Sequence, residues 1–103
     1  MYKIYTTPLF DKWFASFRDK RVKARIQLRI DRMEDGYFGD KKTIGSGVFE
    51  LRFFFGSGYR LYYFHKEQDI VVLLVGGDKS TQSIDIMFAQ QLAKELKGDR
   101  NVN

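Results

Sequence analysis

The residues best suited to chemistry lie in one predicted β-hairpin. Residues 48–55 alternate between an apolar face and a mixed face that includes Glu50 and Arg52, which is the period-2 pattern of a strand. The Gly-Ser-Gly run at residues 56–58 predicts a tight turn, because glycine accepts positive φ. Residues 59–64 form a second strand-like run, which is rich in aromatic side chains and carries Arg60.

The pairing register of this hairpin decides which side chains meet. A three-residue loop at 56–58 places Arg52 opposite Tyr62 and Phe54 opposite Arg60. A two-residue loop would shift the pairing by one residue and move Arg60 to the apolar face, so we favour the first register. Glu50, Arg52, Arg60 and Tyr62 then lie on one surface. A guanidinium group presents a planar fork to two oxygen atoms, so this surface suits an anion.

The overall charge also favours an anionic partner. The formal net charge is +5 and the pI is about 9.5, which points to a polyanion or an acidic protein. A basic protein without such a partner is the plainer alternative. The chain has 103 residues and is 44% hydrophobic and 17% aromatic, so we expect a single packed domain over residues 1–103.

Missing residue types exclude several kinds of site. The chain has no cysteine, which excludes disulfides and thiolate metal sites, and its one histidine, His65, excludes a multi-histidine zinc site. We therefore expect no metal and no cofactor, and we interpret His65 as a surface or strand-edge residue. No signal peptide is visible, and the longest apolar run, residues 70–75, is too short to span a bilayer. The expected location is the cytoplasm, without a membrane partner.

A strand and two helices are predicted before the hairpin. Residues 2–5 form a short strand candidate, Thr7-Pro8 begins the first helix, and Asp19 caps a second helix that runs to about Asp35 before Gly36. The short connection between them predicts a helical hairpin. The apolar stripes of the two helices are Phe10, Trp13, Phe14 and Phe17, and Val22, Ile26, Ile30 and Met33.

The second helix also carries a basic row. Arg21, Arg25, Arg29 and Arg32 recur at helical spacing and line one side. The row is either a solvated face or a strip that contacts phosphates or a partner protein. Contacts to phosphates would add affinity that falls with salt. Lys41 and Lys42 lie in the predicted loop 36–47 and add a weaker basic signal.

A central strand and a final helix are predicted after the hairpin. The continuous β-branched run at 70–75 indicates a strand covered on both faces. Gly76-Gly77 after it permits a close approach of the backbone or a sharp turn. Asp78 or Ser80 caps a helix that ends at Gly98. We expect residues 99–103 to form a frayed polar tail. The predicted apolar face of this helix is Ile84, Met87, Phe88, Leu92 and Leu96.

The resulting order is β-α-α-β-β-β-α. It predicts an α+β domain in which a small, mainly antiparallel sheet carries a helical hairpin and a C-terminal helix, with the helices on one face.

This order, together with several short motifs, resembles the RelE/ParE superfamily of bacterial toxins, and more closely its HigB-like addiction module killer group. The resemblance covers roughly residues 3 to 96. The matching motifs are Trp13-Phe14, Arg25-Ile26, Gly-Val-Phe-Glu-Leu-Arg at 47–52, Gly-Tyr-Arg-Leu-Tyr-Tyr at 58–63 and Leu-Val-Gly-Gly-Asp-Lys-Ser-Thr-Gln at 74–82.

The resemblance implies a toxin that is held silent by an antitoxin from the same operon, typically a helix-turn-helix protein. For the RelE side it implies ribosome-dependent, metal-independent cleavage of mRNA, which inhibits translation. The ParE side of the same fold poisons DNA gyrase instead, so the fold alone does not choose the activity. A basic domain that binds nucleic acid or a partner without catalysis is the third alternative.

If the chain is a ribonuclease, the resemblance and the chemistry together suggest catalytic roles. Cleavage by the ribose 2′-oxygen needs a base, cations around the phosphorane and an acid for the leaving 5′-oxygen. Glu50 would be the base, Arg52 and Arg60 would bind the phosphorane, and Lys79 would bind phosphate or assist the leaving group. Residues 83–86 contain neither the tyrosine nor the histidine that some members carry near the start of the last helix, so the general acid stays unassigned.

Other residues would bind the RNA. Tyr62 would stack a base, and the basic side chains expected to contact RNA are Lys41, Lys42, Arg25 and Arg29. These polar residues also have a purely structural interpretation, in which Glu50 forms a surface ion pair with Arg52 or with Arg60.

Overall fold

The long apolar run forms an interior strand of a five-stranded mixed sheet, between an edge strand and the middle strand. The computed structural model describes residues 1–98 and orders the strands β1-β5-β4-β3-β2. Strand β5 (Ile70–Gly77) pairs in parallel with β1 (Lys3–Thr6) and antiparallel with β4 (Arg60–Glu67). Strands β3 (Val48–Arg52) and β2 (Lys41–Thr43) continue the sheet antiparallel. The fold is therefore α+β, as predicted.

The helices begin where the sequence signals place them. The Thr7 side chain accepts a hydrogen bond from the Phe10 amide at the start of α1 (Pro8–Ala15), and Asp19 caps α2 (Lys20–Glu34). Gly36 follows α2 with a φ of 89°. A 3₁₀ turn, η1 (Lys79–Thr81), is capped by Asp78 and leads into α3 (Gln82–Gly98). These boundaries confirm the predicted helix starts and the Asp78 cap.

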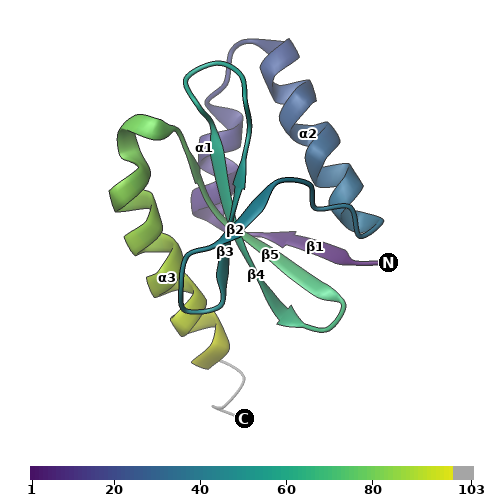
Figure 1. Ribbon diagram of the computed structural model, residues 1–103, viewed down its shortest axis with the longest axis vertical. Helices are drawn as coiled ribbons and strands as arrows, with labels where there is room; N and C mark the ends of the chain where they lie inside the picture. The colour runs from purple at the N-terminus through teal and green to yellow at the C-terminus, as the bar shows by residue number, and fades with distance from the viewer. Residues whose placement is uncertain (99–103) are drawn as a thin grey trace.

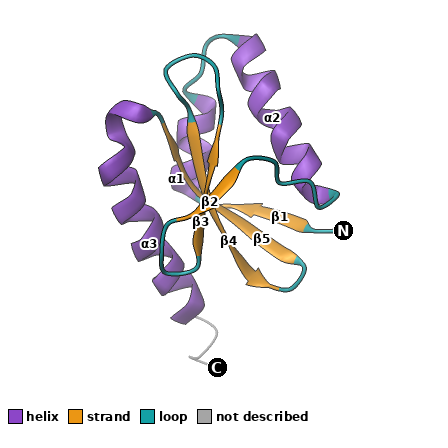
Figure 2. Ribbon diagram, viewed as in Figure 1, coloured by secondary structure: helices purple, strands orange, loops and turns teal. Residues whose placement is uncertain are grey.

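The helices cover both faces of the sheet, and the prediction that they lie on one face is wrong. Figures 1 and 2 show α3 on one side of the strands and α2 on the other. Buried side chains of α1 and α2 pack on one core with alternate strand residues such as Leu61 and Leu73. Ala89 and Ala93 of α3 pack on a second core with Tyr62 and Leu74. Because strand side chains alternate in direction, a sheet buried on both faces needs helices on both.

The hairpin register differs from the prediction by two residues. Arg52 pairs with Arg60 and Glu50 with Tyr62, so Arg52 does not lie opposite Tyr62. The strands separate earlier than expected, and Phe53 to Tyr59 form a wider loop that is closed by a 2.9 Å hydrogen bond from the Phe53 amide to the Tyr59 carbonyl. A shift of two residues keeps every side chain on its predicted face. The prediction that Glu50, Arg52, Arg60 and Tyr62 occupy one face is therefore confirmed.

Two further differences concern the edge of the sheet and α3. Residues 41–43, predicted as loop, form the short edge strand β2. On α3 the predicted apolar face is only partly confirmed: Leu92 and Leu96 pack against the core, whereas Ile84, Met87 and Phe88 are exposed. Ala89 and Ala93 face the sheet in their place. Small alanine side chains let the helix approach the strands closely, and the larger apolar residues are left on the flank.

Among residues 1–98, no helix combines the length and apolar character that crossing a bilayer requires. The expected frayed tail, residues 99–103, lies outside the described residues.

Candidate functional site

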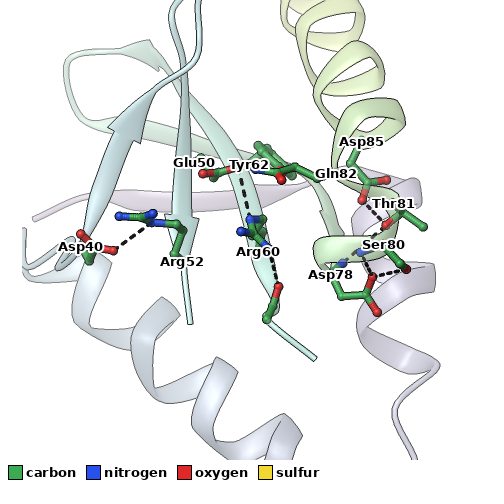
Figure 3. A network of polar contacts seen from close by, with 11 residues as sticks. Asp40, Glu50, Arg52, Arg60, Tyr62, Asp78, Ser80, Thr81, Gln82 and Asp85 are labelled. Atoms are coloured by element: carbon green, nitrogen blue, oxygen red, sulfur yellow. Dashed lines mark hydrogen bonds and ion pairs between the residues drawn. The ribbon is translucent and has the colours of Figure 1, made fainter. Parts of the chain in front are cut away.

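Two arginines stand directly opposite each other at the loop end of the hairpin. Arg52 on β3 pairs with Arg60 on β4. Like charges directly opposite on a sheet are destabilising, so this pair costs stability. Each arginine has its own acidic partner: the Arg52 Nε lies 3.1 Å from an Asp40 oxygen, and the Arg60 Nε lies 3.6 Å from a Glu50 oxygen. The two acids hold the two cations side by side (Figure 3).

Glu50 is the buried centre of a hydrogen-bond network. Its side chain is 1% exposed, and its Oε2 accepts hydrogen bonds of 2.9 Å from the Tyr62 hydroxyl and from the Gln82 side-chain amide. Burial, and then the bond to Glu50, raise the pKa of the Tyr62 hydroxyl, so this group stays protonated and donates. The network ties β3 and β4 to the start of α3.

Arg60 is held on two sides by this arrangement. Its side chain is 14% exposed, and its Nη1 donates a 2.8 Å hydrogen bond to the Gly58 carbonyl. The buried Nε makes no hydrogen bond, because the Glu50 oxygen is too distant, so it contributes only an ion pair. No hydrogen bond joins its Nη2 to any of residues 1–98, which leaves donor capacity for a ligand.

The turn after β3 is fastened to η1. The Ser57 hydroxyl donates to an Asp78 oxygen at 3.1 Å, and the Lys79 amide donates to the Ser57 carbonyl at 3.4 Å. Hydrogen bonds from Ser80, and then from Ser57 and Thr81, hold the pKa of Asp78 below its usual value, so the carboxylate stays ionised as a cap. Lys79 itself is exposed beside the turn.

These elements enclose an open cleft of about 320 Å³. Its cationic lining residues are Arg52, Arg60 and Lys79, and the Glu50 carboxylate lies buried behind them. The aromatic rings of Phe54 and Tyr59 form part of the wall. Three cations and exposed aromatic rings around one cleft form an arrangement suited to a phosphate group and an attached base.

The structure brings three of the four predicted catalytic residues together at this cleft and removes the fourth from its surface. Arg52, Arg60 and Lys79 line it. Glu50 is buried, which contradicts the expectation that it meets the substrate as a general base. It pairs with Arg60 and not with Arg52, so its contacts are those of a residue that positions Arg60.

The residues predicted to bind RNA differ in their exposure to solvent. Tyr62 is fully buried, so the expectation that a base stacks on its ring is wrong. Arg29 is occupied within the protein, because it donates to the Arg52 and Phe38 carbonyls. Burial, as the largest cause, lowers the pKa of the Arg29 guanidinium from its ordinary value. Arg25 is exposed and lies with its guanidinium carbon 3.9 Å from the centre of the Phe55 ring.

The two lysines of β2 lie on opposite faces of the sheet. Lys42 pairs with Glu50 and shares the face of the cleft, whereas Lys41 pairs with Leu51 on the α2 face. The Lys41 ammonium lies 5.1 Å from the Phe38 ring, in an aromatic cluster that also contains His65. His65 is therefore not the plain surface residue that we expected, and burial, followed by Lys41, lowers its pKa.

Sequence reasoning missed four contributors to the site. Asp40 holds Arg52, Gln82 holds Glu50, and Phe54 and Tyr59 supply the aromatic wall. Only Phe54 left a signal, because it is an apolar residue on the polar face of the predicted strand. The other three depend on contacts between distant segments that spacing does not reveal.

Two glycines at the end of β5 let the helices approach the site, which confirms the expected close approach. A Cβ at Gly76 would overlap the Trp13 ring, and a Cβ at Gly77 would overlap the Asp85 carboxylate. Asp85 is buried and accepts a 2.6 Å hydrogen bond from the Thr81 hydroxyl. Burial raises the pKa of Asp85.

Comparison with known proteins identifies a family. The family model described as "Phage derived protein Gp49-like (DUF891)" matches residues 12–96, which include every element of the cleft. The chain belongs to the Gp49-like family. The Gp49-like match is compatible with a toxin of the RelE/HigB type and with a cognate antitoxin as partner. An uncharacterized protein of Haemophilus influenzae (strain ATCC 51907 / DSM 11121 / KW20 / Rd) is 48% identical over 94 residues, which cover 91% of this chain and 95% of that relative.

Proposed function

We propose that this Gp49-like protein is the toxin of a type II toxin–antitoxin system and that it cleaves mRNA on the translating ribosome without a metal ion. The observation that carries the proposal is the convergence of Arg52, Arg60 and Lys79 on one open cleft. Membership of a toxin-like family and the basic net charge of +5 support it.

The cleft suits the electrostatic part of the reaction. The ribose 2′-oxygen would attack the neighbouring phosphorus and lose its proton, and the bond to the 5′-oxygen would break as that oxygen gains a proton. Negative charge grows on the non-bridging oxygens in the transition state, where fixed cations stabilise it more than they stabilise the substrate. Arg60 is the best-fixed cation, because Glu50 and the Gly58 carbonyl both hold it.

The burial of Glu50 supports a revised set of roles. Glu50 orients Arg60 and does not take the proton of the 2′-hydroxyl. Lys79, which is exposed at the cleft, is the residue that we assign to the phosphate and the leaving group. No residue is assigned as the general base.

The partner in this proposal is a cognate antitoxin, typically a helix-turn-helix protein encoded beside the toxin. It would inhibit the toxin by covering the cleft or by blocking access to the ribosome.

The decisive experiment is a cell-free translation reaction in which the 5′ ends of an mRNA are mapped by primer extension. Wild-type protein should produce new ends only when ribosomes translate. Lys79→Ala and Arg60→Lys should each lower the cleavage rate by about 10²-fold. Lys79→Ala is the cleaner variant, because the Lys79 side chain is exposed and makes no contact in the core. Arg21→Ala, which removes one exposed charge from the start of α2, is the control.

Intact mRNA in all reactions, with an active ribonuclease toxin as positive control, would refute the proposal. If DNA gyrase then accumulated cleaved DNA in the presence of the protein, the ParE-type activity would take its place. If neither target were affected but RNA still bound to the protein, binding without catalysis would be the function.

A further inference from the structure

The loop between β3 and β4 stands between two basic clefts. The first is the candidate site described above. The second, of about 290 Å³, lies between this loop and α2. Its cationic lining residues are Arg25, Arg29 and Arg32. Phe53, Phe54 and Phe55 line both clefts, so this short segment forms their common wall.

Phe54 is the exposed member of this wall. Its side chain is 78% exposed, the largest exposure of any phenylalanine in the chain, whereas Phe53 is buried in the core. The nearest cation is Arg52, whose guanidinium carbon lies 5.6 Å from the centre of the Phe54 ring. Leaving an apolar ring in contact with water costs free energy relative to burying it. Phe54 has no contact in the core that offsets this cost.

Hydrogen bonds and ring contacts hold the base of the loop on both sides of Phe54. The Phe53 amide is bonded to the Tyr59 carbonyl at 2.9 Å, and the Gly58 amide to the Phe55 carbonyl at 3.3 Å. The Phe55 ring is held between Arg25, at 3.9 Å, and the edge of Tyr59, with ring centres 5.6 Å apart. These contacts hold the backbone that carries Phe54.

We propose that single-stranded RNA crosses this loop with one base stacked on Phe54, with phosphates in both clefts. Arg25 and Arg32 would contact the backbone on the α2 side, and Arg52 and Arg60 on the other. Arg29 is not included, because its guanidinium already donates to two carbonyl groups of the protein. This inference deepens the proposed function and rests on it for the choice of RNA as ligand.

Single-stranded RNA fits the observations better than the alternatives do. An exposed ring between cations matches an unpaired base with its flanking phosphates, since base stacking and phosphate contacts together make single-strand binding sites. A duplex keeps its bases stacked internally and offers none to Phe54. An acidic peptide would use the cations but would gain little from the ring. On this view, Phe54 is a positioning residue that sets which phosphodiester lies against Arg60.

The test is binding of the full chain to a fluorescein-labelled single-stranded RNA whose 2′-oxygens are methylated, measured by fluorescence anisotropy. This probe has no free 2′-hydroxyl, so binding is read without cleavage. Phe54→Ala should weaken binding by about tenfold or more, and Phe54→Trp should retain or strengthen it. Tyr37→Ala, which removes an aromatic ring that is 71% exposed and lines neither cleft, is the matched control and should change nothing.

Two further variants separate stacking and phosphate contacts from other causes. Phe54→Leu keeps an apolar side chain without an aromatic face and should bind as weakly as Phe54→Ala. Arg25→Gln and Arg32→Gln should each reduce the dependence of affinity on salt by about one ion, whereas Arg21→Gln should not.

The outcomes divide clearly. Wild-type affinity in Phe54→Ala or in Phe54→Leu would overturn the stacking proposal, even if the translation experiment shows cleavage. The choice of ligand would be overturned if Phe54→Ala lost as much affinity for a duplex probe as for the single strand. It would also be overturned if an acidic peptide displaced the RNA and its own binding required Phe54. If the predicted losses are seen but no mRNA is cleaved, the inference stands and the nuclease proposal fails.

Discussion

Removal of the Glu50 carboxylate is expected to destabilise the fold strongly. Three groups converge on its Oε2: the Tyr62 hydroxyl and the Gln82 amide at 2.9 Å, and the Arg60 Nε at 3.6 Å. In Glu50→Ala, the largely buried Arg60 loses its counter-ion, which typically costs about 3–5 kcal/mol. The buried Tyr62 hydroxyl also loses its acceptor, at a cost of about 1–3 kcal/mol. Because water can enter the space that the side chain leaves, the two costs do not add in full, and we expect a loss of about 3–5 kcal/mol in total.

The amide variant gives a graded test of the same reasoning. Glu50→Gln keeps the volume and one acceptor oxygen but removes the charge, so we expect a smaller loss of about 1–3 kcal/mol. A domain of this kind is stable by about 5–15 kcal/mol, so Glu50→Gln should remain folded even if Glu50→Ala does not. Glu67→Gln, an exposed carboxylate at the end of β4, is the control and should stay within about 0.5 kcal/mol of the wild type.

Urea denaturation followed by circular dichroism measures these free energies of unfolding, with linear extrapolation to water. The ranking that we expect is Glu67→Gln above Glu50→Gln above Glu50→Ala. If Glu50→Gln and Glu50→Ala both matched the control, the network would not hold the hairpin to α3, and the positioning role of Glu50 would be refuted.

Three further predictions follow from the packing around the site. Gly76→Ala should lower the free energy of unfolding by about 1–3 kcal/mol or more, because the new Cβ meets the Trp13 ring. Urea denaturation measures this loss, and an unchanged midpoint would contradict the contact. The pKa of Asp85 is raised in the folded state, so ionisation favours unfolding, and stability from this group is present at low pH and lost as the pH rises through the folded pKa. Asp85→Asn does not titrate, so its stability relative to the wild type should increase between about pH 3 and pH 7, and a flat difference would contradict burial as the cause. Arg29→Gln should cost about 1–3 kcal/mol, because two main-chain carbonyls lose a charged donor, whereas Arg21→Gln, with a side chain that is 93% exposed, should cost almost nothing; thermal and urea unfolding compare the two.

Local signals predicted the elements well because their causes are local. Thr7 and Asp19 cap helices through their own side chains, and the apolar run at 70–75 has no polar side that solvent could face. The face of each hairpin residue was also predictable, because side chains alternate along a strand. A pairing register that is wrong by two residues leaves every side chain on its predicted face. The pairing register was not predictable, because Gly56-Ser57-Gly58 permits several loop lengths. In the structure, the loop that joins the strands also contacts α2 and η1, which lie far from it in the sequence.

The burial of individual polar groups could not be predicted in this way. Glu50 and Tyr62 lie on the mixed face, but α3 covers that part of it and hides both. The sequence pattern of α3 misled because Ala89 and Ala93 are weakly hydrophobic and score below the larger Met87 and Phe88, which remain exposed. Close packing favours small residues at a helix–sheet contact, and hydrophobicity alone does not register this preference.

The parallel pairing of β1 with β5 has a consequence for how the protein is made. Lys3 pairs with Ile70, and the Thr7 hydroxyl donates a hydrogen bond to the Leu74 carbonyl. Strand β1 therefore cannot pair with β5 until about seventy further residues have been synthesised. Gln82, which completes the Glu50 network, is translated later still. A nascent chain therefore carries the arginines without the strand and helix that hold them, and the cleft is assembled only when synthesis is nearly finished.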